Sequence, residues 1–142
     1  MGHQQLLLLT LGAILVSIAT SVGMTAFVEN ASSMNRDAVS NDLMYFATRA
    51  MQHYRKPVEL GGGGNSFAGL TTKYLANKVD ANGIIHNANG SYQIMGTPSG
   101  NNPLQIKGTG VEIGYDGQNK LSLVMNVWPD SLQIDLTHAA SN

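Results

Sequence analysis

The feature that most constrains this chain is an uncharged run near its beginning. From Leu6 to Val28 the sequence reads LLLLTLGAILVSIATSVGMTAFV, without Asp, Glu, Lys or Arg. A helix needs roughly 20 apolar residues to cross a bilayer, so this run is long enough to span one. A chain that carries such a run must hold it in lipid or bury it against protein.

The helical pattern continues beyond Val28 but becomes two-sided. Apolar residues recur at spacings of three and four, which marks one face of an amphipathic helix. The residues of this face are Val39, Leu43, Phe46, Ala47, Ala50 and Tyr54. We place His53 on the solvent or subunit face of the same helix. Pro57 disfavours helix at the residue before it, so we predict one helix over residues 3–55, roughly 80 Å long at 1.5 Å per residue.

Short alternating segments follow the helix and are separated by turn residues. The run Gly61–Gly64 has no side chains to pack and is predicted as a loop, and residues 70–79 are either a short helix or a connector. Candidate strands are residues 83–86, 91–95, 104–107, 111–115, 121–128 and 132–136. Asp116-Gly117 is a strong hairpin-turn dipeptide. Short connections between adjacent strands indicate an antiparallel meander.

One face of this predicted sheet is apolar and needs a cover. The residues of that face are Leu104, Ile106, Val111, Ile113, Leu121, Leu123, Leu132, Ile134 and Leu136. The apolar face of the helix is the obvious cover, because each element must bury its apolar side against another. We predict an α+β fold in which a long N-terminal α-helix, apolar in its first half and amphipathic in its second, packs on a small antiparallel β-sheet.

The chain divides by composition into two parts. Residues 1–28 form the apolar helix, for a membrane or a filament core. Residues 29–142 form a globular domain with helix 29–56, a Gly-rich loop 57–70 and a sheet at about 84–137. A formal net charge of −1 gives no sign of a nucleic-acid partner, and the absence of cysteine excludes disulfides and thiolate metal sites.

No pattern of catalytic residues is present in the sequence. The four histidines have no metal-ligand spacing, no GxSxG occurs, and no Gly-Lys-Ser/Thr follows the glycine run. Asp80–Gly83 lacks the further ligands of a calcium loop and is better interpreted as a glycine-containing turn. We therefore expect no enzyme activity, no cofactor and no metal site.

Small residues recur every four positions in the apolar half. One series is Ala13, Ser17 and Ser21, and a second contains Ala19 and Gly23, with Gly12 as a further small position. Such spacing lets helices approach closely, although small residues are also common in membrane helices generally.

Two Asn-x-Ser sequons begin at Asn30 and Asn89. If the domain lies outside the cell they are candidate sites for surface glycans; the alternative is that such short motifs arise by chance in an Asn-rich chain. Asn89, in a turn, is the better acceptor, because a glycan at Asn30 would clash in a tight assembly.

The start does not have the pattern of a cleaved secretory signal. No Lys or Arg occurs before Arg36, and the apolar run is longer than the apolar core of a signal peptide. A single-span protein should carry basic residues at its cytoplasmic end. We expect either that a short basic leader is removed upstream of Met1 or that orientation is set in another way.

An uncharged helix, its amphipathic continuation and a small antiparallel sheet together resemble a type IV pilin or pilin-like subunit. The segment Gly2-His3-Gln4-Gln5-Leu6 is similar to a prepilin-type processing region. The family usually has a glutamate at the fifth mature position, which pairs with a neighbouring subunit's amine. Here that position holds Gln5 if the mature chain starts at Met1, or Leu7 if cleavage follows Gly2. Gln5 offers a hydrogen bond but no ion pair, and the C-terminal disulfide common in bacterial pilins is impossible.

The resemblance implies a structural subunit of an extracellular filament, held in the inner membrane before assembly and then joined to copies of itself. Gln5, Gly12, Ala13, Ser17, Ser21 and Gly23 are the candidate assembly residues. The alternatives are a minor pseudopilin of a secretion system and a single-span protein with a small exposed binding domain.

Overall fold

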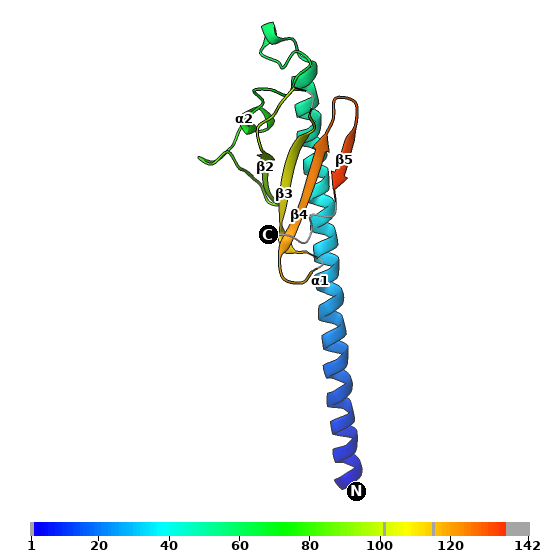
Figure 1. Ribbon diagram of the computed structural model, residues 1–142. Helices are drawn as coiled ribbons and strands as arrows, with labels where there is room; N and C mark the ends of the chain where they lie inside the picture. Colours follow the sequence, from blue (N-terminus) through cyan, green and yellow to red (C-terminus); the bar gives the residue numbers. More distant parts are fainter. Residues whose placement is uncertain (1, 101, 115, 136–142) are drawn as a thin grey trace.

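The computed structural model describes residues 2–100, 102–114 and 116–135 and has the α+β fold predicted from the sequence. Helix α1 (Gly2–Arg55) runs without interruption through 54 residues, including Gly12 and Gly23, and is roughly 80 Å long. Figure 1 shows the sheet lying along one side of the second half of α1, while the first half extends away from the domain. The helix therefore both anchors the domain and projects from it.

The sheet has five antiparallel strands in the sequential order β1-β2-β3-β4-β5, as a meander requires. The strands are β1 (Ile85–His86), β2 (Gly90–Met95), β3 (Leu104–Ile113), β4 (Lys120–Val127) and β5 (Leu132–Asp135). The sequence pattern predicted two separate strands at 104–107 and 111–115. That division is wrong, because Leu104–Ile113 forms the single strand β3. The register between β3 and β4 shifts between Thr109 and Ile113, which explains why the alternation in the sequence changes phase there.

The core lies between α1 and the sheet. The predicted helical face is confirmed, since Val39, Leu43, Phe46, Ala47 and Ala50 are buried and Tyr54 packs against them half-buried. On the sheet, Leu104, Ile106, Leu121 and Leu123 are buried as expected, and Tyr92, Met125 and Val127 join them. Gly108 lies under this helix face, where an added Cβ would come within 2.9 Å of Val39.

Three residues of the predicted apolar sheet face are exposed instead. Val111 and Ile113 follow the register shift and turn away from the core, and Leu132 lies on the edge strand β5. Ile134 is half-buried, and Leu136 lies outside the described residues. The alternation of apolar and polar residues in the sequence therefore predicted more buried positions at the end of β3 than the structure has.

The glycine run caps the C-terminal end of α1. The Gly63 N–H donates to His53 O at 2.8 Å and the Gly64 N–H donates to Lys56 O at 3.0 Å, so carbonyls without helical partners are satisfied. A Cβ on Gly62 would collide with Lys56 O, and one on Gly63 would collide with Ser66 O. The predicted loop 57–70 is thus a tightly packed cap, and it contains a short 3-10 helix, η1 (Val58–Leu60).

His53 is buried, so its predicted place on the solvent or subunit face is wrong. Only 7% of its surface is exposed, because the cap covers it and the ring of Tyr74 meets its ring at 4.6 Å. Tyr74 belongs to α2 (Thr72–Leu75), which settles the 70–79 segment as a short helix with its flanking connector. Leu70 and Leu75 are buried there, as expected for the helical alternative.

Candidate assembly surface

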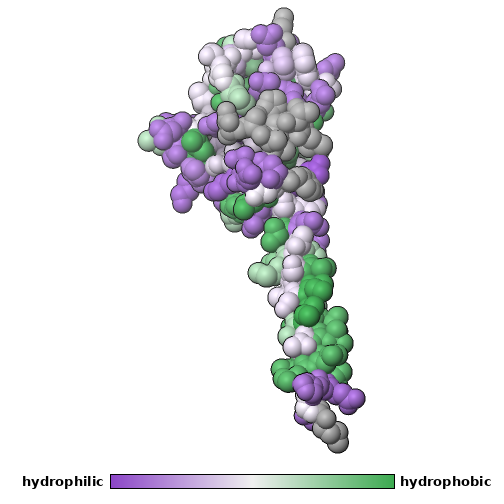
Figure 2. All heavy atoms as spheres, turned by 60° about the horizontal axis from the view of Figure 1, so that its bottom comes forward, coloured by the Kyte–Doolittle hydropathy of each residue, from purple (hydrophilic) through white to green (hydrophobic). Residues whose placement is uncertain are grey.

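The first half of α1 is an apolar surface with nothing packed against it. All residues from Gly2 to Asn30 are exposed, and the first buried residue is Ser32. The helix is long and apolar enough to cross a membrane. Figure 2 shows hydrophobic atoms gathered along this half, while the visible surface of the domain is mainly hydrophilic. About 30 residues, or roughly 45 Å of helix, therefore project beyond the domain.

Four hydroxyl groups in this apolar half, including those of Ser17, Thr20 and Thr25, bond to the helix itself. Ser17 Oγ donates to Ala13 O at 2.8 Å, Thr20 Oγ1 to Val16 O at 2.8 Å, and Thr25 Oγ1 to Ser21 O at 3.1 Å. An unpaired hydroxyl would be unfavourable in an apolar medium. These side chains therefore do not prevent the helix from entering lipid or a protein core.

The predicted assembly residues all lie on this exposed half, on two sides of it. Ala13, Ser17 and Ser21 are four apart and share one side of the helix. Gly12 and Gly23 are eleven apart, about three turns, and share another side. The helix thus offers two sides on which another helix could approach closely. Gln5 lies near the free N-terminal end and is exposed.

A polar junction ties α1 to the lower end of the sheet, where the domain begins. Ser32 Oγ donates to Ile113 O at 2.8 Å. Asn35 donates through Nδ2 to Asn89 O at 2.9 Å and accepts from the Val111 N–H at 3.1 Å. Ser32 and Asn35 are both buried, so these bonds lie away from solvent.

Asp42 forms the centre of a second polar cluster, which we call the Asp42 latch. Its Oδ2 accepts hydrogen bonds from Asn87 Nδ2 at 2.8 Å, Asn89 Nδ2 at 2.8 Å and Tyr92 OH at 2.6 Å. Desolvation opposes the charged form, but these three donors outweigh it and hold the pKa of Asp42 below its ordinary value. Burial, together with the Asp42 carboxylate, raises the pKa of Tyr92.

Sequence reasoning missed the latch residues Asp42, Asn87 and Tyr92. The donors lie 45 to 50 residues from Asp42 along the chain, so no local spacing could reveal them. The one available signal was a carboxylate next to the apolar helix face, between Val39 and Leu43. A charge at that border needs partners from the covering sheet.

The two sequon asparagines differ in their surroundings. Asn30 is exposed on α1, two residues before the domain contacts begin. Asn89 is half-buried, and the nitrogen that would carry a glycan donates to Asp42. A glycan on Asn89 would therefore replace a bond of the Asp42 latch.

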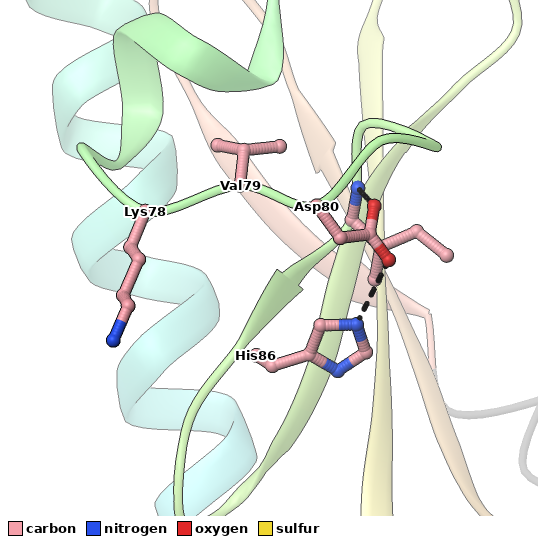
Figure 3. A pocket seen from close by; sticks show the side chains of 5 residues that line it. Lys78, Val79, Asp80 and His86 are labelled. Carbon is pink, nitrogen blue, oxygen red and sulfur yellow. Dashed lines mark hydrogen bonds and ion pairs between the residues drawn. The ribbon is translucent and has the colours of Figure 1, made fainter.

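A small pocket beside β1 holds an Asp–His pair. Figure 3 shows Lys78, Val79, Asp80 and His86 around it, with the His86 ring directed at the Asp80 carboxylate. His86 Nε2 lies 3.1 Å from Asp80 Oδ2, and Asp80 Oδ1 accepts from the Ile84 N–H at 2.8 Å. The Ile84 N–H above all, with His86 and Asn82, holds the pKa of Asp80 below its ordinary value.

This geometry gives Asp80 a structural role. Its carboxylate closes the turn before β1, and Gly83 has the positive φ of 79° that such a turn favours. The glycine-containing turn predicted at 80–83 is therefore present. Among residues 2–100, 102–114 and 116–135, no group of three or more His, Cys, Asp or Glu side chains is placed to hold a metal ion.

Comparisons with protein-family models, with curated proteins and with solved structures give no match to this chain.

Proposed function

We propose that this chain is the structural subunit of an extracellular, type IV pilus-like filament that polymerises through α1. The observation that carries the proposal is the exposed, uncharged first half of α1, joined without a break to a half that is packed against the domain. The filament has the apolar halves as its core and the sheets as its shell. Before assembly, the same half holds the subunit in the membrane.

The energetics favour assembly once the helix leaves lipid. Removal of apolar surface from water is worth about 25 cal/mol per Å², so a helix that buries on the order of 1,000 Å² gains about 25 kcal/mol before ordering costs, relative to the same helix exposed to water. Copies related by a helical rotation make heterologous contacts that do not close into a ring. The two small-residue sides of α1, around Ser17 and around Gly12 and Gly23, suit such a contact, because one side can meet a preceding copy and the other a following copy.

The polar junction and the Asp42 latch support the same role. In a filament, tension passes from helix to helix, and each domain must stay attached to its own helix. Ser32, Asn35 and Asp42 bind the sheet through directed hydrogen bonds spread over about three turns of α1. We further propose that the chain is not an enzyme, because Asp80 of the Asp80–His86 pair closes a turn and no group of side chains placed to hold a metal ion occurs among the described residues.

The alternative functions use the same helix differently. A minor pseudopilin would form a short piston confined to the cell envelope, and a single-span binding protein would keep its helix in the membrane. The two small-residue sides favour the filament, since a lone membrane anchor has no need for close helix contacts.

Imaging filaments made by cells that express this chain tests the proposal. Wild type should give long filaments composed of this chain alone. Ala13→Phe and Ser17→Phe should reduce filament number at least 10-fold, because a bulky ring prevents close approach of helices. Leu15→Phe is the matched control, since it keeps a large apolar side chain in the same membrane segment.

Stable monomers that never polymerise after extraction in detergent would favour the single-span alternative. Short assemblies confined to the envelope would favour the pseudopilin. Normal filaments from Ala13→Phe and Ser17→Phe would refute the packing proposed for α1.

A further inference from the structure

One end of the domain presents two exposed aliphatic side chains on a fixed turn. Val58 and Leu60 are 67% and 66% exposed. We call residues 57–61 the tip turn. The Leu60 N–H donates to Pro57 O at 3.1 Å, and the Gly61 N–H donates to Val58 O at 2.9 Å. Because the turn is already ordered, a partner that binds it needs to fix little backbone.

The other end of the domain has a hollow with one aliphatic side chain and one lysine in its lining. The hollow measures about 260 Å³ and lies between the β1–β2 turn and the ends of β3 and β4. We call it the base hollow. Its lining includes His86, Ser91, Thr109, Val111 and Lys120. Val111 is 50% exposed there although its strand pattern predicts a core position, so nothing within the described part of the chain buries it.

The tip turn and the base hollow lie too far apart to meet within one chain. The strand end beside the hollow is fixed to Asn35, whereas the tip turn begins at Pro57, 22 residues later. Along a helix that separation is roughly 33 Å. Figure 1 shows the 58–60 turn beyond the C-terminal end of α1 and the β3–β4 turn at the opposite end of the sheet.

The two surfaces carry opposite charges next to their apolar groups. Glu59 lies between Val58 and Leu60 in the tip turn, and Lys120 lies beside Val111 in the base hollow. Within residues 2–100, 102–114 and 116–135, neither Glu59 nor Lys120 forms an ion pair. A carboxylate and an ammonium that flank complementary apolar groups can set the register of a contact.

We propose that the tip turn of one copy docks in the base hollow of the next copy along the filament, with Leu60 against Val111 and Glu59 beside Lys120. The proposal rests on the proposed filament function, because a contact between opposite ends is heterologous and does not close. It spaces stacked copies by roughly 33 Å. The apolar half of α1 projects further, roughly 45 Å, so it overlaps α1 of the copy below.

The contact is too small to hold two free subunits together. A stable interface buries about 1,000 Å² or more, far beyond a few side chains. It forms among copies that α1 already holds, where the effective concentration is high. It therefore stiffens and aligns an existing filament.

Cysteine pairing in filaments of the full chain tests the docking directly, because the natural sequence has no cysteine. Leu60→Cys combined with Val111→Cys should give a ladder of covalent multimers under a mild oxidant such as copper phenanthroline. Each single variant should give dimers at most. Leu60→Cys with Gln133→Cys is the control pair, since Gln133 is exposed on β5, away from the hollow. A disulfide within one chain is excluded by distance.

Charge exchange provides a second test that does not depend on a double cysteine variant assembling. Glu59→Lys and Lys120→Glu should each raise the subunit concentration needed for filaments by about 2- to 5-fold, as for an exposed ion pair, and the double variant should restore it. If wild type forms filaments but the Leu60→Cys/Val111→Cys variant cross-links no better than the control pair, the docking is overturned and the proposed function still stands. The same holds if the charge-exchanged double variant is as weak as the single ones. Absence of filaments from wild type would overturn the proposed function itself.

Discussion

Removal of the Asp42 carboxylate should loosen the domain from its helix. In Asp42→Ala, the hydroxyl of Tyr92 and the side-chain amide of Asn89 lose their acceptor. Each hydrogen bond to a charged group contributes about 1.5–3 kcal/mol, and a buried donor left unpaired costs about 1–3 kcal/mol. One carboxylate oxygen serves all the donors, and Asn87 is exposed, so the contributions do not add fully. We expect Asp42→Ala to lower the free energy of unfolding by about 3–5 kcal/mol.

The pH dependence of the stability provides a second, independent test of the Asp42 latch. The pKa of Asp42 is lower in the folded protein than in the unfolded chain, so its charge stabilises the fold at neutral pH. That contribution is present above the ordinary aspartate value of 3.8 and is lost as pH falls through the lower pKa of the folded state. Asp42→Asn should remove this part of the acid sensitivity.

Urea titration of the full chain in detergent measures both parts, with fluorescence of Trp128, the sole tryptophan, as the signal. Asp37→Ala is the matched control, because Asp37 is an exposed carboxylate on the same helix. It should change stability by less than about 0.5 kcal/mol. A loss below about 1 kcal/mol in Asp42→Ala, or an unchanged acid response in Asp42→Asn, would refute the proposed role of the latch.

Three further predictions concern the cap and the junction. Burial, and to a smaller extent the charge of Lys56, lowers the pKa of His53. The free energy of unfolding of wild type should therefore decrease as pH falls below the ordinary histidine value of 6.5. His53→Phe should remove this pH dependence in urea titrations between pH 7.5 and 5. Gly63→Ala should destabilise the cap by more than about 1 kcal/mol, because the added Cβ would collide with Ser66 O. The change should appear as faster amide hydrogen exchange at residues 62–65. Gly100→Ala is the control and should have little effect, since its Cβ would lie 3.5 Å from the nearest atom. Ser32→Ala should cost about 1 kcal/mol in urea titration and leave filament formation intact, which a failure to assemble would contradict.

The sequence was sufficient for those parts of the fold that depend on periodicity. The 3.6-residue pattern of Val39, Leu43, Phe46, Ala47 and Ala50 identified the helix face that the sheet covers, and Pro57 located its end. Antiparallel strand order followed from the short connections. These features are local, so a single sequence contains them.

Contacts between distant segments could not be predicted in this way. The burial of His53 depends on a glycine cap that folds back onto the preceding helical turn, and the exposure of Val111 depends on a register shift in β3. The latch joins Asp42 to an asparagine pair 45 and 47 residues away. The exposure of the candidate assembly residues, by contrast, followed directly from the length of the helix relative to its domain.

The hydroxyls bonded to their own helix have a consequence for how the subunit changes surroundings. Thr10, Ser17, Thr20 and Thr25 keep the same acceptors whether the neighbours are acyl chains or other subunits. For these four side chains, lipid and the core of the proposed filament would then be nearly equivalent surroundings. None of these four hydroxyls has to find a new partner when the helix is exchanged between the two. In the proposed filament, the direction of that exchange would therefore depend on groups outside these turns, such as Gln5 and the contacts of the domain.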